Sequence, residues 1–420
     1  MTLLSLALQS LWNRRVSALL TAASIAISVA LLLSVRQLSV QAHSAFASTV
    51  SGTDLIVGAR SGQLNLLLYS VFRIGDATNN VSWNLYHNLS KQRDVAWAIP
   101  LSLGDSHRGF RVLGTDDNYY RYFRFGRERT LEFAAGHATA DLYDAVIGSE
   151  VARKLGYHVG DSMIVAHGTG AVSFAQHKDK PFVVAGILKP TGTPVDRTVH
   201  VSLEAIEAIH IDWQSGSQAP EASRISADDA RKQDLTPKTV TAILIGVKSK
   251  LSIFDLQRSI NDYRGEPLLA IMPGVALQQL WDVLGVVENL LTIVGAMVVI
   301  AGLICLLTTI LTSLNERRRE IAILRSVGAR PAHVFALFIS EAAVLACAGT
   351  LLGVMINQLV LLAARPLLQQ RYGLVLDSTT WSAGDAGVLI VVIAAAVAIG
   401  ALPAWQAYRR TLADGLAVRT

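Results

Sequence analysis

Residues 290–311 read LLTIVGAMVVIAGLICLLTTIL, a run of 22 residues without a charged side chain. An α-helix needs about 20 apolar residues to cross the hydrocarbon core of a bilayer, so this run is long enough to span a membrane. Three further runs, 16–35, 342–364 and 386–408, also lack charged side chains, and Pro403 interrupts the last of them. The sequence therefore predicts four transmembrane helices.

The charge-free run at residues 16–35 has two explanations. Residues 45–47 (AFA) resemble the small-residue cleavage site that follows a secretory signal peptide. The apolar segment of such a peptide has about 7–15 residues, however, and the run at 16–35 has 20. We therefore expect a membrane helix that is retained.

The composition indicates that a large soluble domain accompanies these helices. Of the 420 residues, 51% are hydrophobic and 16% are charged, and the mean hydropathy is +0.40. Soluble domains carry about 25% charged residues. Four spans account for only about 80 positions, so most of the chain must lie outside the membrane.

Both cysteines, Cys305 and Cys347, fall in apolar runs, so the sequence supports neither a disulfide framework nor a thiolate metal site.

The arginines beside the four runs indicate the orientation in the membrane. Four spans place both termini on one side, and the short segments on that side hold Arg14, Arg15, Arg317, Arg318, Arg319, Arg325, Arg330, Arg409, Arg410 and Arg419. The loop between the last two spans holds only Arg365 and Arg371. Loops rich in arginine stay in the cytoplasm. We therefore expect cytoplasmic termini, and the net charge of +5 does not indicate a nucleic-acid partner.

The predicted fold class is an α-helical membrane protein with four transmembrane helices and a large mixed α/β extracytoplasmic domain. The predicted parts are an amphipathic cytoplasmic segment (1–15), transmembrane helix 1 (16–36), the outer domain (37–283), transmembrane helix 2 with a stalk (284–312), a cytoplasmic loop (313–333), transmembrane helix 3 (334–364), a short outer loop (365–385), transmembrane helix 4 (386–405) and a cytoplasmic tail (406–420).

Local patterns inside the outer domain predict both strands and helices. Residues 182–188 and 241–247 are rich in β-branched side chains and favour buried strands. Residues 149–155 favour a short helix with Ser149 as its N-cap and a stop at the following glycine. The polar stretch 215–237 is typical of a mobile loop.

The cytoplasmic loop contains NERRREIAILRSVG at residues 315–328. Ile321, Leu324 and Val327 recur at three-residue spacing, which places them on one face of a helix. Gly328 is suited to end that helix, and Pro331 can open the next one, since its missing N–H would be unpaired at the first position. On composition alone, a basic loop that only sets topology explains the segment better, because basic loops are expected on the cytoplasmic side.

A resemblance to a known family favours a functional role for this loop. Residues 316–353, ERRREIAILRSVGARPAHVFALFISEAAVLACAGTLLG, resemble the span–coupling-helix–span signature of the permease superfamily that contains the macrolide exporter, lipoprotein-release and FtsX cell-division proteins. Residues 402–419 (LPAWQAYRRTLADGLAVR) and 6–33 (LALQSLWNRRVSALLTAASIAISVALLL) are similar to its closing and opening segments.

The outer domain resembles the MacB-like periplasmic core domain of the same superfamily. The similar pieces are DLIVGARSG (54–62), FRVLGTDDNYY (110–120) and AVIGSEVARKLGYHVGDSMIV (145–165). The resemblance becomes weak between Trp213 and Thr239.

The resemblance implies a permease subunit of a bacterial ABC transporter in the inner membrane, with partners that supply the missing parts. No GxxxxGK[ST] phosphate loop occurs in the sequence, so we expect no ATPase activity and no cofactor in this chain, with ATP and Mg held by a separate cytoplasmic ATPase dimer. The implied docking residues are those of the coupling helix: Glu316, Arg317, Arg318, Arg319, Glu320, Ile321, Leu324, Arg325, Val327 and Gly328. The other implied partners are membrane lipid, a periplasmic partner protein and a second permease chain, expected to be an identical copy, although a heterodimer stays open.

Three residues of the predicted transmembrane helix 3 (334–364) stand out. Glu341 is ionisable near the cytoplasmic end of the span, and we expect it to pair with Arg318 or Arg14 rather than to handle ions or protons. Gly349 and Gly353 form a small-xxx-small pattern that favours close helix packing.

Catalytic and metal-binding motifs do not emerge from the sequence. Nine of the ten histidines lie in the outer domain: His43, His87, His107, His137, His158, His167, His177, His200 and His210. They form no dense cluster along the chain, the closest pairing with a carboxylate being His210 with Asp212, so we predict no metal site. The sequence also lacks GxSxG, HExxH and a glycine-rich dinucleotide turn.

The expected function is mechanotransmission: ATP hydrolysis by the partner drives a change in the outer domain, for export or extraction of an envelope substrate. One alternative is an FtsX-like signalling permease that activates a periplasmic partner. Another is a metal-linked permease served by a periplasmic binding protein. The size of the outer domain favours the macrolide-export and lipoprotein-release branches over the FtsX branch.

Overall fold

A computed structural model of the chain describes residues 3–49, 51–126, 128–168, 177, 179–214, 217–218, 224–316, 318–372 and 381–409. The chain divides into two units. One, which we call the helical unit, comprises residues 1–41, 285–367 and 376–420, and the other, the sheet domain, comprises residues 42–284 and 368–375.

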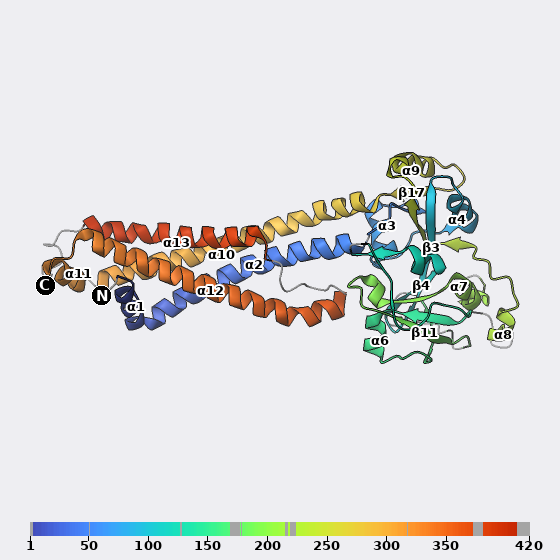
Figure 1. The fold of residues 1–420 in the computed structure, drawn as a ribbon, viewed down its shortest axis with the longest axis horizontal. Helices are drawn as coiled ribbons and strands as arrows, with labels where there is room; N and C mark the ends of the chain where they lie inside the picture. The colour runs from blue at the N-terminus through green and yellow to red at the C-terminus, as the bar shows by residue number, and fades with distance from the viewer. Residues whose placement is uncertain are drawn as a thin grey trace. The chain divides into compact units, whose positions relative to one another are not determined.

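Six helices build or enter the helical unit: α1 (Leu3–Asn13), α2 (Arg15–Thr49), α10 (Pro273–Glu316), α11 (Arg318–Ser326), α12 (Pro331–Tyr372) and α13 (Ala383–Arg409). Four of them, α2, α10, α12 and α13, are long and apolar enough to cross a membrane (Figure 1). The four-helix prediction is therefore confirmed.

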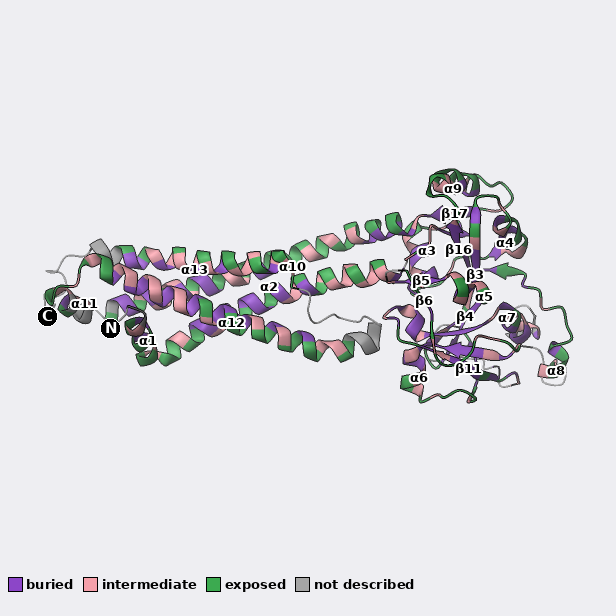
Figure 2. Ribbon diagram, viewed as in Figure 1, coloured by how far each residue is buried: buried purple, intermediate pink, exposed green. Residues whose placement is uncertain are grey.

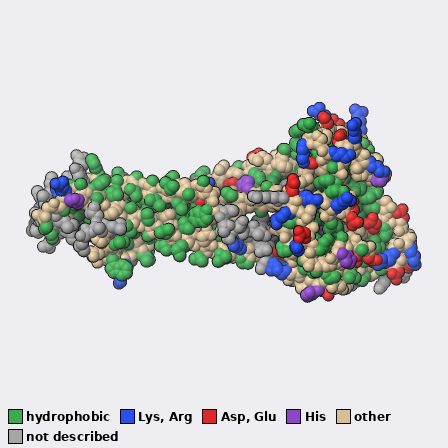
Figure 3. Space-filling model, in the orientation of Figure 1, with side chains coloured by type: hydrophobic (Ala, Val, Ile, Leu, Met, Phe, Trp, Pro, Cys, Tyr) green, Lys and Arg blue, Asp and Glu red, His purple; other side chains and the backbone are tan. Residues whose placement is uncertain are grey.

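The helical unit is held together by apolar contacts between these helices. Leu306 of α10, Phe338 of α12 and Ala396 of α13 belong to one buried cluster, and Val29 of α2 packs with Val392 of α13 in another. Figure 3 shows hydrophobic side chains over the visible face of the long helices, whereas Lys, Arg, Asp and Glu gather on the sheet domain. An apolar outer surface of this kind is what contact with lipid requires.

Helices α2 and α10 are longer than the charge-free runs from which they were predicted. They have 35 and 44 residues, and both continue into the sheet domain. There Phe46 of α2 and Trp281 of α10 pack on the domain core, with their ring centroids 5.4 Å apart, and His43 stacks on Trp281 at 3.6 Å. The thickness of the bilayer determines the length of the apolar run. Outside that run, the contacts of Phe46 and Trp281 with the domain core stabilise the two helices.

The sheet domain is a mixed α/β fold, as predicted. Its strands are β1 (Leu55–Ala59), β2 (Val81–Ser82), β3 (Val95–His107), β4 (Phe110–Thr115), β5 (Arg124–Phe125), β6 (Arg129–Thr130), β7 (Phe133–Gly136), β8 (Asp144–Ile147), β9 (Ser162–Met163), β10 (Ala166–His167), β11 (Phe182–Leu188), β12 (Thr198–Ser202), β13 (Trp213–Gln214), β14 (Ser217–Gln218), β15 (Thr239–Val240), β16 (Ala242–Val247) and β17 (Leu268–Ile271). Its helices are α3 (Gln63–Ser70), α4 (Trp83–Ser90), α5 (Asp117–Tyr122), α6 (Ser149–Leu155), α7 (Leu203–His210), α8 (Ala227–Ala230) and α9 (Ile253–Asn261), with 3₁₀ turns η1 (Pro194–Arg197) and η3 (Lys250–Ser252).

An eleven-stranded sheet runs through this domain in the order β17-β1-β16-β3-β4-β12-β8-β11-β7, with β10 added to β3 and β9 to β11. Alternation along the strands divides the core: Ile56 and Leu244 face a cluster that includes Leu66 of α3, and Ile243 faces a second cluster that includes Leu256 of α9. A third cluster lies under α6 and α7. Figure 2 shows the buried strands.

Several local predictions can be compared with these elements. β11 has the predicted bounds, and β16 begins one residue later than predicted. The N-cap of α6 is Gly148, so the prediction of Ser149 was wrong, whereas Gly156 ends the helix in the left-handed region as expected. Within the predicted loop 215–237, residues 215–216 and 219–223 lie outside the described residues, and α8 occupies part of the remainder with Ala230 fully buried.

Candidate functional site

The segment between α10 and α12 forms a separate short helix, α11. Gly328 has φ +105°, a conformation that glycine adopts readily, and it follows the helix end at Ser326. Pro331 is the first residue of α12, as predicted. These two residues separate the nine-residue helix α11 from α12.

The faces of α11 have different environments. Ile321 packs on the buried cluster that α10 and α12 share, and Ala322 is 5% exposed. Ile323 and Val327, in contrast, are 52% and 83% exposed. The prediction that Ile321 and Val327 lie on one face of the helix is therefore wrong, because Ile321 packs on its own chain while Val327 is exposed. Of the other predicted docking residues, Arg317 lies outside the described residues, as do the side chains of Arg318, Arg319, Glu320 and Leu324.

An ion pair joins Arg14, the residue between α1 and α2, to Glu316 at the end of α10. Arg14 Nη2 lies 3.0 Å from a carboxylate oxygen of Glu316 and donates to the carbonyl oxygen of Ser313 at 3.3 Å. The predicted docking residue Glu316 is thus held by its own chain. Glu341, for which Arg14 was a predicted partner, is a buried residue of α12 with 3% exposure.

Gly349 and Gly353 lie against α2. A Cβ atom added to Gly349 would stand 2.8 Å from the Ile25 Cβ, and one added to Gly353 would stand 2.7 Å from the carbonyl oxygen of Ala26. Both distances are too short for a side chain, so α2 and α12 approach each other at positions where only glycine fits.

A chain of polar side chains, missed by the sequence analysis, connects α2, α12 and α13. Ser34 donates to Asn357 at 2.7 Å, Asn357 donates to Gln37 at 2.9 Å, and Arg36 forms an ion pair with Asp385 at 3.0 Å. Gln37, Asn357 and Asp385 are at most 5% exposed. The asparagine within the third apolar run was the signal that could have indicated it, because polar groups inside a membrane helix need partners.

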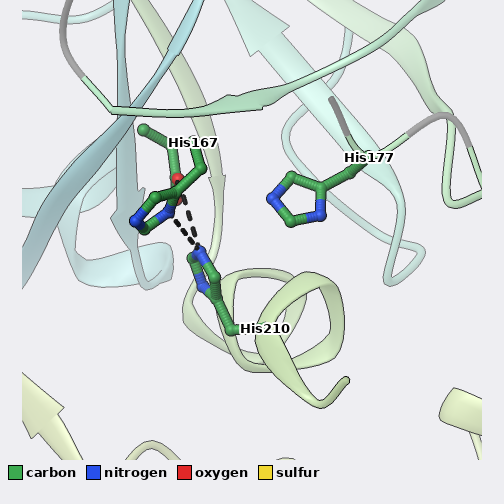
Figure 4. Close-up of side chains that lie close together, drawn as sticks. His167, His177 and His210 are labelled. Carbon is green, nitrogen blue, oxygen red and sulfur yellow. Dashed lines mark hydrogen bonds and ion pairs between the residues drawn. The ribbon is translucent and has the colours of Figure 1, made fainter. Parts of the chain in front are cut away.

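A second group missed from the sequence lies in the sheet domain, where Asp105, His167, His177 and His210 converge (Figure 4). One potential ligand atom from each lies within 4.8 Å of the others. His167 is paired with Asp105 in the register of β10 on β3, and His210 is the last residue of α7. No sequence spacing could indicate this group, since β pairing and helix packing assemble it.

Hydrogen bonds, charges and burial within the cluster shift the pKa values of Asp105, His210 and His177. Burial alone would raise the pKa of Asp105, but hydrogen bonds from His167 and His210 and their charges lower it to about 2. Burial would lower the pKa of His210, and the hydrogen bond and charge of Asp105 raise it instead. For His177, burial followed by the charge of His210 lowers the pKa to about 4. The cluster therefore combines one carboxylate with two imidazoles, those of His177 and His210, whose pKa values shift in opposite directions.

Comparison with known families accounts for both units. Residues 18–263 match the MacB-like periplasmic core domain family, and residues 292–412 match the FtsX-like permease C-terminal family. Among curated proteins, the macrolide export ATP-binding/permease protein MacB of Nitrobacter winogradskyi is 30% identical over 128 residues, which are 30% of this chain and 19% of that protein. The protein of the same name from Azoarcus sp. is 24% identical over 188 residues, which are 42% of this chain and 25% of that protein.

Solved structures of outer domains also resemble the chain. The periplasmic region of MacB from Actinobacillus actinomycetemcomitans has a TM-score of 0.34 and 11% identity, covering 56% of this chain and 97% of that structure. The extracellular domain of the noncanonic ABC-type transporter YknZ from Gram-positive bacteria has a TM-score of 0.30 and 13% identity, covering 52% of this chain and 99% of that structure. Since the periplasmic core domain family alone covers more than half of the residues, the chain belongs to the MacB/FtsX family of ABC-transporter permeases, which are multi-pass inner-membrane proteins.

Proposed function

We propose that the chain is the permease subunit of a mechanotransmission system for export or extraction of an envelope substrate. A separate ABC ATPase binds α11 on the cytoplasmic side, where both termini also lie. ATP and Mg are held by that ATPase, because this sequence contains no GxxxxGK[ST] loop. Two permease chains, expected to be identical copies, form the complex.

The docking surface consists of the exposed apolar side chains of Ile323 in α11 and of Val327, the residue directly after it. The backbone N–H of Val327 donates to the carbonyl oxygen of Ile323 at 3.1 Å, so Val327 continues the last helical turn and lies on the same side as Ile323. Ile321 and Ala322 are on the side of α11 that packs on the helical unit. A partner bound at Ile323 and Val327 therefore contacts a helix whose opposite side is already packed on its own chain. An amphipathic helix in an apolar groove is a recurring mode of protein recognition.

The observation that carries the proposal is the continuity of α2 and α10 with the sheet. α10 begins at Pro273, separated by one residue from the end of β17 at Ile271, and α2 ends at Thr49, shortly before β1 begins at Leu55. β1 and β17 are neighbouring strands, with Val57 opposite Ala270. A helix of 44 residues is about 66 Å long, more than twice the hydrocarbon thickness of about 30 Å. Movement at one end of α10 therefore has a covalent, helical path to the sheet.

Substitution of the exposed residues tests docking. Val327→Asp and Ile323→Asp should each abolish co-purification of the ATPase and its stimulation, because burying an unpaired charge at an apolar anchor costs about 2 kcal/mol or more. Leu251→Asp is the matched control, since Leu251 of η3 is 89% exposed and apolar but lies in the sheet domain.

The measurement is ATPase recovered per permease chain, at equal membrane levels and with insertion verified. Normal recovery and stimulation in both α11 variants would show that α11 is only a topology-setting loop. Equal loss in Leu251→Asp would assign the effect to any added surface charge.

A further inference from the structure

We propose that Asp105, His167, His177 and His210 form a binding site for one divalent transition-metal ion of the zinc class. The four residues come from β3, β10, the segment before β11, and the end of α7. Metal binding here goes beyond the permease function proposed above and does not depend on ATPase docking.

The distances between three of the side chains match a tetrahedral coordination shell. His167 Nδ1 lies 3.2 Å from Asp105 Oδ1 and 3.1 Å from His210 Nε2, and His210 Nε2 lies 3.4 Å from Asp105 Oδ1. Zinc bonds of about 2.0–2.1 Å at tetrahedral angles separate neighbouring ligand atoms by about 3.3–3.5 Å. The three atoms therefore already form one face of such a tetrahedron. His177, within 4.8 Å of them, is the fourth ligand.

Hydrogen bonding of His210 presents the correct ring nitrogen. Its Nδ1 lies 2.9 Å from the carbonyl oxygen of Ile206, and because a carbonyl only accepts, Nδ1 carries the proton. In the neutral ring Nε2 then carries the lone pair, and Nε2 is the atom that faces Asp105 and His167. A ring N–H donated to a backbone carbonyl is the usual outer support of a histidine bound to a metal.

A metal ion explains this arrangement better than a shared proton does. A proton on His210 Nε2 can be directed at Asp105 or at His167, and it leaves the other contact without a hydrogen bond. A cation at the centre interacts with all of these atoms at once. Asp105 is 2% exposed, and a buried carboxylate facing imidazole nitrogens is a common donor set for zinc.

The surroundings hold the ligands in place. His177 donates its backbone N–H to the carbonyl oxygen of Val165, next to β10, at 3.0 Å. Lys180, three residues later, is fully buried and forms an ion pair at 2.5 Å with Asp212, which follows α7. This pair ties the segment that carries His177 to the end of the helix that carries His210.

The ligand set also defines the class of ion. Three imidazoles and one carboxylate suit Zn²⁺ and its first-row neighbours, whereas Mg²⁺ and Ca²⁺ prefer oxygen ligands. Four protein ligands fill a tetrahedral shell, which is typical of a structural or sensing site rather than a catalytic one. His167 has a half-exposed side chain, at 48%, which gives the ion a route from solvent.

The test uses the full chain in detergent, purified without a histidine tag and stripped with a chelator. Wild-type protein should retain one Zn²⁺ per chain after gel filtration, and Mg²⁺ in excess should not displace it. His167→Ala and Asp105→Asn should weaken Zn²⁺ binding by more than the about 10–100-fold that loss of an outer partner costs. His87→Ala is the control, because His87 is an exposed histidine of α4 outside the cluster.

A second measurement keeps the test decisive if a ligand variant folds poorly. Co²⁺ bound to wild-type protein should give the intense visible absorption of a tetrahedral site. A hydrated, octahedral spectrum would overturn the proposal. The proposal would also be overturned if the wild-type protein retained no Zn²⁺. The same holds if folded His167→Ala and Asp105→Asn variants retained as much Zn²⁺ as the wild type.

Discussion

Asp116 shows how one carboxylate combines a structural role with a titration near neutral pH. It is the N-cap of α5, accepts from the Asn118 backbone N–H at 3.1 Å, and accepts from the Tyr86 hydroxyl at 3.1 Å. Burial raises its pKa from 3.8 to about 6, against these hydrogen bonds, which lower it. The folded chain therefore binds a proton at Asp116 that the unfolded chain releases at lower pH.

This shift predicts a pH-dependent stability. Because the folded pKa lies above the unfolded one, the free energy of unfolding should fall as pH rises from about 4 to about 6 and then level off. Asp116→Asn keeps an N-cap side chain and removes the titration. Relative to the variant, the wild type should lose about 1 kcal/mol over that range, a figure reduced for partial solvent exposure.

The measurement is thermal or denaturant unfolding of the detergent-purified chain, followed by tryptophan fluorescence at several pH values. Identical pH dependence in the wild type and Asp116→Asn would contradict the assigned shift.

At the scale of elements, the contact between α2 and α12 depends on two glycines. Gly353→Val should lower the melting temperature by an amount that corresponds to about 1–3 kcal/mol, the usual cost of overpacking, because the new side chain collides with Ala26 and Val29. Gly387→Val is the matched control in α13, since an added Cβ there meets nothing within 4 Å. Equal melting temperatures for the two variants in detergent would show that this contact does not stabilise the bundle.

Elements were predictable from the sequence where a local pattern determines them. Four apolar runs, the β-branched segment 182–188 and the glycine and proline at 328 and 331 all correspond to elements of the structure. The extension of α10 back to Pro273 was not predictable, because it depends on where Trp281 packs.

Residues brought together by tertiary contacts were also beyond prediction. Asp105 and His167 are 62 positions apart and meet only through β10 and β3, while Gln37 and Asn357 are 320 positions apart. The histidine cluster and the buried polar chain therefore required the fold. The exposed side of α11 required it too, since three-residue spacing alone does not indicate that Ile321 packs inward.

At the scale of the whole molecule, the central claim is that an event at α11 changes the sheet domain. α10 carries residues of both units on one helix, with Ile310 in the helical core and Leu277 in the sheet-domain core. The ends of α2 and α10 meet again in the sheet domain through Phe46 and Trp281. Residues 42–49 and 273–284 are therefore the segments in which a transmitted movement should first be detected.

Amide hydrogen exchange of the membrane-reconstituted complex tests this claim most directly. With the ATPase bound, trapping it in the nucleotide-bound state should change exchange in segments 42–49 and 273–284, and Val327→Asp should abolish that change. Leu251→Asp should behave as the wild type. If the ATPase binds and turns over nucleotide while exchange in both segments stays the same, the sheet domain does not respond to α11, and the mechanotransmission account is wrong.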